Sequence, residues 1–404
     1  LPIFKSVDGG ATWQPLPSTV NGTPQSWDDK FEYVWQIATD PSNLTQDEVY
    51  AVPALGGVFR SMDGGATWNA VLGSFGNSSS IFTDIAVTST GVVYATLSEY
   101  SVGNGSATVR GIYRSADGTN WKNITPAGWP EKYKRIVIGV SPSDENQVYF
   151  LAETPDNGFA GKFVLREETR TEWHSLWKYT YTSGDGTGAG GVWENRSSNL
   201  PAFGGRLGAF LSQGSYDLVI AVKPDNPNIV FIGGTNLYRS TDGFATKNNT
   251  TWIGGYAPET PLARFPAYDN HHSDQHAISF LPSNPTILLS GNDGGVQRTD
   301  NSLAETVGWK PLNNGYITTQ FYTVAVDKSA DKSNVVLGGA QDNGTWLTTN
   351  TNAQADWKKP WGADGAYCAV ANGRTSYYIS SQQGKVYRFL IDASGDTLAH
   401  TRVD

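Results

Sequence analysis

Short runs of branched and aromatic residues recur along the chain three at a time, and polar, glycine-rich segments separate them. One set consists of Ile37–Asp40, Val49–Val52 and Val58–Arg60. Apolar runs of this length that are bounded by turn-forming residues are typical of β-strands. Seven such sets fit between residues 31 and 390, and each leaves room for a fourth strand. The pattern therefore predicts successive four-stranded units, with strands A (innermost), B, C and D in chain order.

A motif recurs in register with these units, between strands C and D. Its first copy, at residues 6–13, reads SVDGGATW. The aspartate of the motif is Asp8 in that copy, and it returns as Asp63, Asp117 and, in a weaker copy, Asp242. The spacings between these aspartates are 55, 54 and 125 residues, and the long interval holds a copy with almost no motif left, beginning at Phe163.

A period near 55 residues suits four short strands with their turns, which is the unit of a propeller blade. We therefore predict an all-β fold, a single β-propeller over residues 1–404 with seven blade repeats. A partial blade is expected at residues 1–16, where a lone C–D pair runs from Ile3 to Leu16, and a larger insertion is expected near residues 183–205. Because that pair lacks strands A and B, we expect the parent chain to continue at both ends, in a disc of eight to ten blades.

The motif resembles the Asp-box of BNR-type repeats, which occur in sialidases, two-propeller xyloglucanases and sortilin-like propellers. That resemblance implies a structural role for Asp8, Asp63, Asp117 and Asp242, whose carboxylates would hold the C–D turn while glycine supplies the positive φ. Residues 216–370 are also similar to exported bacterial proteins of the BNR-repeat or sortilin-like type, which are often named glycosyl hydrolases.

Four acidic loops are expected on one face of the propeller. Asp274 and Asp364 introduce A strands, whereas Asp293 and Asp342 lie between strands B and C. In an up-and-down blade the D→A and B→C connections emerge on the same face, opposite the C→D turns. These four aspartates are our candidates for catalytic carboxylates, although Asn-Asp-Gly-Gly and Asp-Asn-Gly also form structural turns.

Histidine and tryptophan side chains are further candidates for ligand binding at this face. His271, His272 and His276 surround Asp274, and imidazole with carboxylate at short spacing suits Zn²⁺ or Ca²⁺ chemistry. On an extended loop, however, these side chains do not share a face, so we predict ligand-binding histidines, no metal site and no cofactor. Trp346 and Trp361 are candidates for stacking on sugar rings at the mouth of the channel, although packing between blades is the alternative.

Composition narrows the class of partner. The 29 basic and 38 acidic residues give a formal charge of −9, which disfavours nucleic acid. No apolar stretch approaches the roughly 20 residues that a membrane-spanning helix needs. One cysteine and one methionine in a polar, glycine-rich chain lead us to expect a secreted or cell-surface protein.

Two functions remain open from the sequence. The first is a binding or structural platform for a glycan, a protein or neighbouring subunits, since propellers present a rigid face of loops. The alternative is a glycoside hydrolase that uses two of the four aspartates, one as acid and one as base.

Overall fold

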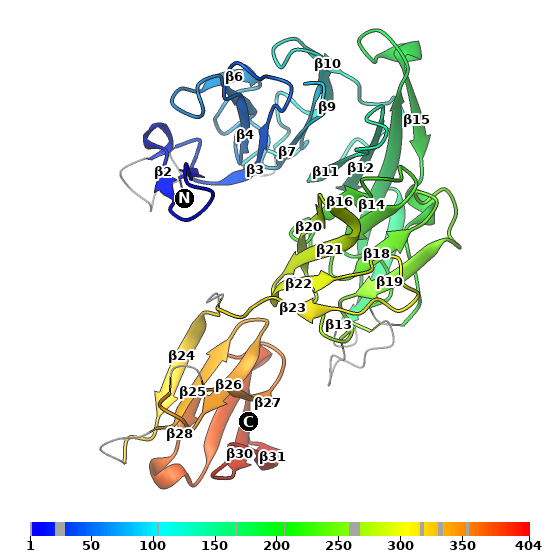
Figure 1. Ribbon diagram of the computed structural model, residues 1–404. Helices are drawn as coiled ribbons and strands as arrows, with labels where there is room; N and C mark the ends of the chain where they lie inside the picture. The colour runs from blue at the N-terminus through cyan, green and yellow to red at the C-terminus, as the bar shows by residue number, and fades with distance from the viewer. Residues whose placement is uncertain are drawn as a thin grey trace.

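The computed structural model describes residues 2–20, 29–102, 105–165, 168–205, 207–257, 267–315, 319–329, 334–352 and 355–404 (Figure 1). Within these ranges the chain consists of β-strands, turns and 3-10 helices of three residues each. The short helices are η1 (Pro17–Thr19), η3 (Gly188–Gly190), η4 (Ser197–Asn199), η5 (Asn372–Arg374) and η6 (Gln382–Gly384). No described helix is long and apolar enough to cross a membrane.

The first four sheets follow a two-stranded hairpin, β1 (Phe4–Lys5) and β2 (Gln14–Pro15). Sheet 1 contains β3 (Val34–Thr39), β4 (Val49–Pro53), β5 (Val58–Ser61) and β6 (Asn69–Leu72). Sheet 2 contains β7 (Thr83–Val87), β8 (Val93–Leu97), β9 (Gly111–Ser115) and β10 (Trp121–Asn123). Sheet 3 contains β11 (Ile136–Val140), β12 (Gln147–Glu153), β13 (Phe159–Leu165), β14 (Glu168–Tyr181) and β15 (Gly191–Asn195). Sheet 4 contains β16 (Val219–Val222), β17 (Val230–Gly233), β18 (Leu237–Ser240) and β19 (Thr250–Gly254).

Three more four-stranded sheets complete the described chain. Sheet 5 contains β20 (Gln275–Leu281), β21 (Asn284–Asn292), β22 (Gly295–Thr299) and β23 (Lys310–Pro311). Sheet 6 contains β24 (Phe321–Val326), β25 (Val336–Ala340), β26 (Gly344–Thr348) and β27 (Lys358–Trp361). Sheet 7 contains β28 (Cys368–Val370), β29 (Tyr377–Ser381), β30 (Lys385–Ile391) and β31 (Thr397–Arg402).

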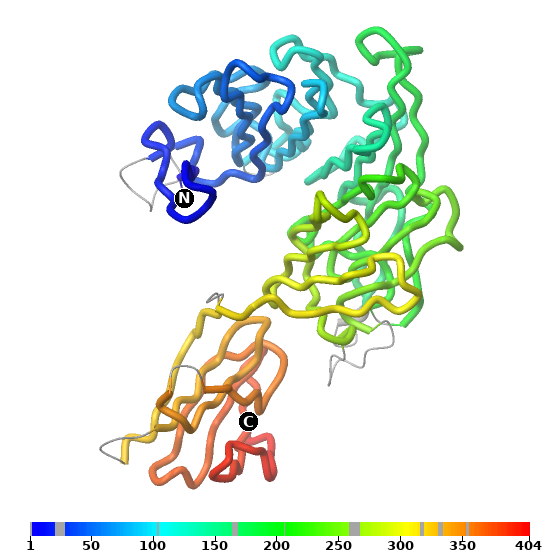
Figure 2. The backbone as a smooth tube through the Cα atoms, in the orientation of Figure 1, coloured from blue at the N-terminus to red at the C-terminus, as the bar shows by residue number. Residues whose placement is uncertain are grey.

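The sheets are antiparallel, and except in sheet 3 the strands pair in chain order. Their first strands face one another: β3 contacts β7, β7 contacts β11, β11 contacts β16, β16 contacts β20, and β24 contacts β28. The chain therefore passes from sheet to sheet along a curved path (Figure 2), and the labels of Figure 1 place β3, β7, β11, β16 and β20 on its inner side. This arrangement, four-stranded meanders that pack side by side on their innermost strands, is that of a β-propeller. The predicted fold class is confirmed, and each sheet is a blade.

Sheet 3 differs from the sequence-based expectation. The segment at Phe163 does not form the third strand of the blade, because Phe163 pairs with Arg170 in a hairpin of β13 and β14. The second half of β14 pairs with β12 on one side and with β15 on the other, so it takes the place of strand C and β15 takes that of strand D. The motif that marks the C–D turn elsewhere is missing here, and nothing in the sequence separates the hairpin from the strand that follows it.

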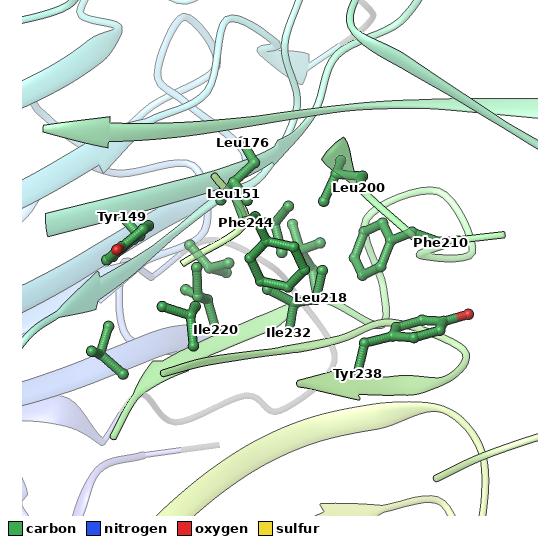
Figure 3. Close-up of a cluster of buried hydrophobic side chains, with 13 residues drawn as sticks. Tyr149, Leu151, Leu176, Leu200, Phe210, Leu218, Ile220, Ile232, Tyr238 and Phe244 are labelled. Carbon is green, nitrogen blue, oxygen red and sulfur yellow. The ribbon is translucent and has the colours of Figure 1, made fainter. Parts of the chain in front are cut away.

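Among the described residues, large apolar side chains fill the space between each pair of adjacent blades except sheets 5 and 6, where Val324 and Val326 of β24 stay exposed. Between sheets 3 and 4, for example, Leu151 and Leu176 pack with Ile220 and Ile232 in a cluster of fully buried residues (Figure 3). Where a neighbouring blade covers each face of a sheet, the second strand is buried on both faces, as in β8 and β17, whereas β29 of the last sheet has a partly exposed face. A strand that is covered on both faces reads as a continuous apolar run, which is why the B strands were so apparent in the sequence.

The motif between strands C and D forms a tight polar turn, which we call the Ser-x-Asp turn. In its second copy, Asp63 Oδ1 accepts hydrogen bonds from Thr67 N at 2.8 Å and from Ser61 Oγ at 2.7 Å. Ser61 Oγ in turn accepts a hydrogen bond from Gly65 N at 2.8 Å, and Gly65 has a φ of +92° that favours glycine. The hydrogen bonds from Thr67 and Ser61 lower the pKa of Asp63 to about 2. Equivalent carboxylate contacts occur at Asp8, Asp117 and Asp242.

Candidate functional site

Three acidic side chains from two adjacent blades meet at one end of the inner strands. Asp274 immediately precedes β20, Asp293 lies between β21 and β22, and Asp342 lies between β25 and β26. One carboxylate oxygen from each lies within 4.8 Å of the others. The strand order explains this proximity, because D→A and B→C connections leave the blades on the same edge. We call this edge the loop face.

The fourth predicted aspartate joins the same group. Asp364 lies between β27 and β28, and its Oδ1 accepts a hydrogen bond from the backbone N–H of Asp342 at 3.0 Å. The structure thus gathers Asp274, Asp293, Asp342 and Asp364 on the loop face, whereas the Ser-x-Asp turns occupy the opposite edges of their blades.

A fifth carboxylate, which the sequence analysis missed, completes what we call the acidic cluster. Asp217 precedes β16, and its side chain is completely inaccessible to solvent. Its Oδ1 lies 4.0 Å from His276 Nε2, the same nitrogen that lies 2.5 Å from Asp293 Oδ1. Neither carboxylate oxygen of Asp217 accepts a hydrogen bond of good geometry from a described donor, although the side chains of Asp274 and Gln213 lie close to it. A buried carboxylate without a partner is costly, so its retention calls for an explanation.

Hydrogen bonds between blades hold the cluster in place. His272 Nε2 donates to the carbonyl oxygen of Asp342 at 3.0 Å, and Asn343 Nδ2 donates to that of Asp293 at 2.9 Å. Both contacts join sheet 5 to sheet 6. Gln213 precedes sheet 4 in the chain, and its Nε2 donates a hydrogen bond to Asp274 Oδ1 at 2.6 Å. The site therefore depends on three consecutive blades.

The environment separates the pKa values of these carboxyl groups. Burial, together with the negative charge of Asp274, raises the pKa of Asp217 to about 9. Burial and the charge of Asp364 raise the pKa of Asp342 to about 7, and burial also raises that of Asp274. For Asp293, burial acts in the same direction, but the hydrogen bond and charge of His276 outweigh it and the pKa is lowered.

Backbone strain is concentrated around the same residues. Eleven described residues other than glycine have a positive φ. Two of them, Asp274 and Asp342, belong to the acidic cluster, and three others, Gln213, Ser215 and Ala363, lie within four residues of a member. Non-glycine residues rarely adopt this conformation, and where they do the surrounding structure must compensate. Such clustering is typical of functional sites.

A pocket of about 320 Å³ opens beside the cluster. Its lining includes residues with carboxylate, imidazole, hydroxyl, amide and ammonium groups: Asp342, Asp364, His272, Ser273, Tyr256, Gln382 and Lys359. The pocket offers a polar ligand several hydrogen-bonding groups, and the carboxylates suit hydroxyl donors or a hard cation.

The remaining predicted ligand-binding residues lie in different surroundings. His271 is buried, with Nδ1 accepting a hydrogen bond from Gly255 N at 3.1 Å and Nε2 within 3.1 Å of Ser290 Oγ. Trp361 packs on the core of sheets 6 and 7, with its ring centroid 4.5 Å from that of Tyr387. Trp346 is half-buried, and its Nε1 donates to the carbonyl oxygen of Asn343. The structure therefore places His272 and His276, but not His271 or Trp361, next to the acidic cluster.

Three exposed tyrosines lie close to the cluster on the loop face. The Tyr216 ring lies edge-on to His276, with centroids 5.1 Å apart, and the Tyr216 side chain is 58% exposed. Tyr322 donates a hydrogen bond to Gln341, the neighbour of Asp342, and Tyr367 follows Asp364 by three residues. Tyr322 and Tyr367 are 60% and 77% exposed. Exposed aromatic rings next to a polar pocket are typical of ligand-binding surfaces.

No protein-family model and no curated protein matches this chain. Among solved structures it is similar to the GH74 enzyme of Niastella koreensis, with 16% sequence identity and a TM-score of 0.48 over 99% of this chain and 60% of that one. It is similar to the GH74 xyloglucanase of Xanthomonas campestris at 14% identity and a TM-score of 0.38, over 99% and 61% of the two chains. The Swd1 β-propeller domain of Myceliophteria thermophila matches at 9% identity and a TM-score of 0.40, over 89% and 98%. The chain thus spans about three fifths of the length of the two GH74 enzymes.

Proposed function

We propose that this β-propeller is an extracellular or cell-surface platform that binds a neutral glycan on its loop face. The observation that carries the proposal is the placement of Tyr216, Tyr322 and Tyr367 around the acidic cluster, all three at the start of an A strand. Sugars present apolar C–H faces that stack on aromatic rings and hydroxyl groups that donate to carboxylates. Both kinds of group are present here within one face.

The charge of the site favours a neutral ligand over an anionic one. Five aspartates gather there, and the whole chain has a formal charge of −9. An anionic glycan, such as one that carries sulfate or uronic acid, would meet repulsion at this face. In buffer without divalent cations we therefore expect neutral polysaccharides to bind and acidic ones to bind weakly.

Binding to immobilised neutral polysaccharides (β-glucans, xylans and mannans) tests the proposal. Tyr216→Ala and Tyr367→Ala each remove an exposed ring, and we expect each to weaken binding about fivefold, since one aromatic contact contributes about 1 kcal/mol. Trp13→Ala is the matched control, because Trp13 is also 58% exposed but belongs to a Ser-x-Asp turn on the opposite edge of its sheet. Failure of every glycan to bind, or equal losses in all three variants, would contradict the proposal.

Glycoside hydrolysis is the second candidate, and one observation favours it. The pKa of Asp342 is raised to about 7 while that of Asp293 is lowered, which is the division expected of a general acid and a general base. The spacing argues against it. Catalytic carboxyl groups lie about 5–5.5 Å apart in retaining enzymes and about 6.5–9.5 Å apart in inverting ones. One oxygen of Asp293 lies within 4.8 Å of one oxygen of Asp342, which is closer than either class of enzyme uses.

Release of reducing ends from any glycan that binds separates the two functions. If the protein is a hydrolase, Asp342→Asn and Asp293→Asn should each lower turnover by about a hundredfold or more, and Asp300→Asn on the opposite edge should not. Binding without measurable turnover by the wild-type protein is the result that we expect from a platform.

A further inference from the structure

We propose that a divalent cation of the Ca²⁺ class binds within the acidic cluster, held by four carboxylates: Asp274, Asp293, Asp342 and Asp217. This inference goes beyond glycan binding and does not depend on it. It also departs from the sequence-based prediction of no metal, which considered the histidines and Asp274 of residues 271–276 as ligands and not carboxylates from three blades.

The spacing of the carboxylate oxygens fits such an ion. Ca²⁺ binds oxygen ligands at about 2.3–2.6 Å, so two oxygens on the same ion are at most about 5 Å apart. One oxygen each from Asp274, Asp293 and Asp342 lies within 4.8 Å of the other two. A set made only of oxygen ligands favours a hard cation over Zn²⁺ or Cu²⁺.

The second, independent observation is the unpaired side chain of Asp217. It is completely buried, neither oxygen accepts a hydrogen bond of good geometry from a described donor, and one of its nearest polar neighbours is another carboxyl group, that of Asp274. Its Oδ1 is directed to the same His276 nitrogen that contacts Asp293, so it faces the cluster. A cation in the cluster would give this carboxylate the partner that it lacks.

The neighbouring cationic side chains do not balance these charges. His276 can contribute at most one positive charge, to Asp293 and Asp217. Arg135 donates to the carbonyl oxygen of Tyr216 at 3.1 Å, and the ammonium group of Lys359 lies 5.5 Å from the centroid of the Trp346 ring. His272 also lies next to Asp274 and Asp293, and Arg135 is shared between Asp217 and Asp84. Four carboxyl groups therefore gather around two imidazoles and a shared guanidinium, and a divalent ion would displace the protons that they hold and offset the negative charge that remains.

The ion would also connect three blades. Asp217 belongs to the entrance of sheet 4, Asp274 and Asp293 to sheet 5, and Asp342 to sheet 6. An ion bound by all four would tie these sheets together at the loop face. Because a ligand that binds only the folded state stabilises it, the cation should raise the midpoint of thermal unfolding.

Isothermal titration of the chelator-treated protein with CaCl₂, MnCl₂ and MgCl₂ tests the proposal. We expect one saturable site with a Kd of about 1 mM or tighter for Ca²⁺, as in extracellular calcium modules, and a rise in the unfolding midpoint at the same concentrations. Asp217→Asn and Asp293→Asn should each weaken Ca²⁺ binding at least tenfold. Asp293 is the more accessible of the two, so its variant keeps the test valid if Asp217→Asn does not fold.

Asp300→Asn is the control, because Asp300 is exposed and pairs with Arg298 and Lys310 at the opposite edge of sheet 5. Its Ca²⁺ affinity should match that of the wild-type protein. The proposal is overturned if the wild-type protein shows no saturable binding of Ca²⁺ or Mn²⁺ at millimolar concentrations. It is also overturned if all three variants bind as the wild-type protein does, because the ions would then bind adventitiously.

Discussion

A buried carboxyl group between sheets 2 and 3 makes the stability of this protein depend on pH in a predictable direction. Asp84 lies in β7 and is 8% exposed, and its Oδ2 accepts a hydrogen bond from Ile138 N in β11 at 2.9 Å. Burial raises the pKa of Asp84 to about 6, although Arg135 and two backbone N–H donors act in the opposite direction. An unfolded aspartate has a pKa near 3.9, so the folded protein holds this proton more tightly.

The sign and size of the effect follow from linkage. A group with a raised pKa in the folded state contributes stability that is fully present below the unfolded pKa and is lost as the pH rises through the folded pKa. The window is therefore about pH 4 to pH 7, and the difference of about 2 pKa units corresponds to about 3 kcal/mol. Asp84→Asn removes the titration and keeps the shape, so the variant should gain about 3 kcal/mol relative to the wild-type protein across this window.

Urea unfolding of both proteins at constant ionic strength, at pH 4, 5, 6, 7 and 8, measures this difference. Other titrating groups are common to the two proteins and cancel. We expect the free energy of unfolding of Asp84→Asn, minus that of the wild-type protein, to increase with pH. If this difference does not change with pH, burial does not dominate the pKa of Asp84. If this difference decreases as the pH rises, the interaction of ionised Asp84 with Arg135 stabilises the interface between the blades.

Two further predictions concern the blades themselves. Ser61→Ala leaves the buried N–H of Gly65 without an acceptor, so it should lower the free energy of unfolding, measured in urea, by about 1–3 kcal/mol. Ser6→Ala, in the exposed first copy of the turn, should lower it by less than about 0.5 kcal/mol. Similar losses in the two variants would refute a structural role for the buried turn. Gly339→Ala places a Cβ atom 2.0 Å from the carbonyl oxygen of residue 366, between sheets 6 and 7, so it should clearly lower the midpoint of thermal unfolding. Gly308 has open space around it, so Gly308→Ala should leave that midpoint unchanged. A tolerated Gly339→Ala would mean that these blades are not in close contact.

The sequence contained most of the fold because each blade repeats the same order of strands. The B strands are buried on both faces, so runs such as Val49–Val52 and Val148–Leu151 stood out as continuous apolar segments. The Ser-x-Asp turn then fixed the register between strands C and D. In sheet 3 the third strand was wrongly predicted at Phe163. This blade has lost the motif and gained a hairpin, so nothing in its sequence marks where strand C ends.

The candidate site was predictable only in part, for a related reason. The order of strands alone dictates which connections share an edge, and this was enough to bring Asp274, Asp293, Asp342 and Asp364 together. Asp217 occupies an equivalent D→A connection, but no turn-forming residue adjoins it, so nothing marked it as more than a polar residue before a strand. The buried positions of His271 and Trp361 depend on side-chain packing between distant segments, which a linear pattern of residue types does not specify.

A crystal structure of the protein grown in the presence of Ca²⁺, with Mn²⁺ as an anomalous scatterer, tests the convergence of the blades on one acidic cluster most directly. We expect a single ion at the loop face, with carboxylate oxygens of Asp274, Asp293 and Asp342 at about 2.3–2.6 Å from Ca²⁺ and the side chain of Asp217 turned to it. Density that shows these carboxylates on separate faces of the molecule, or gathered as described but with no ion among them, would contradict that expectation.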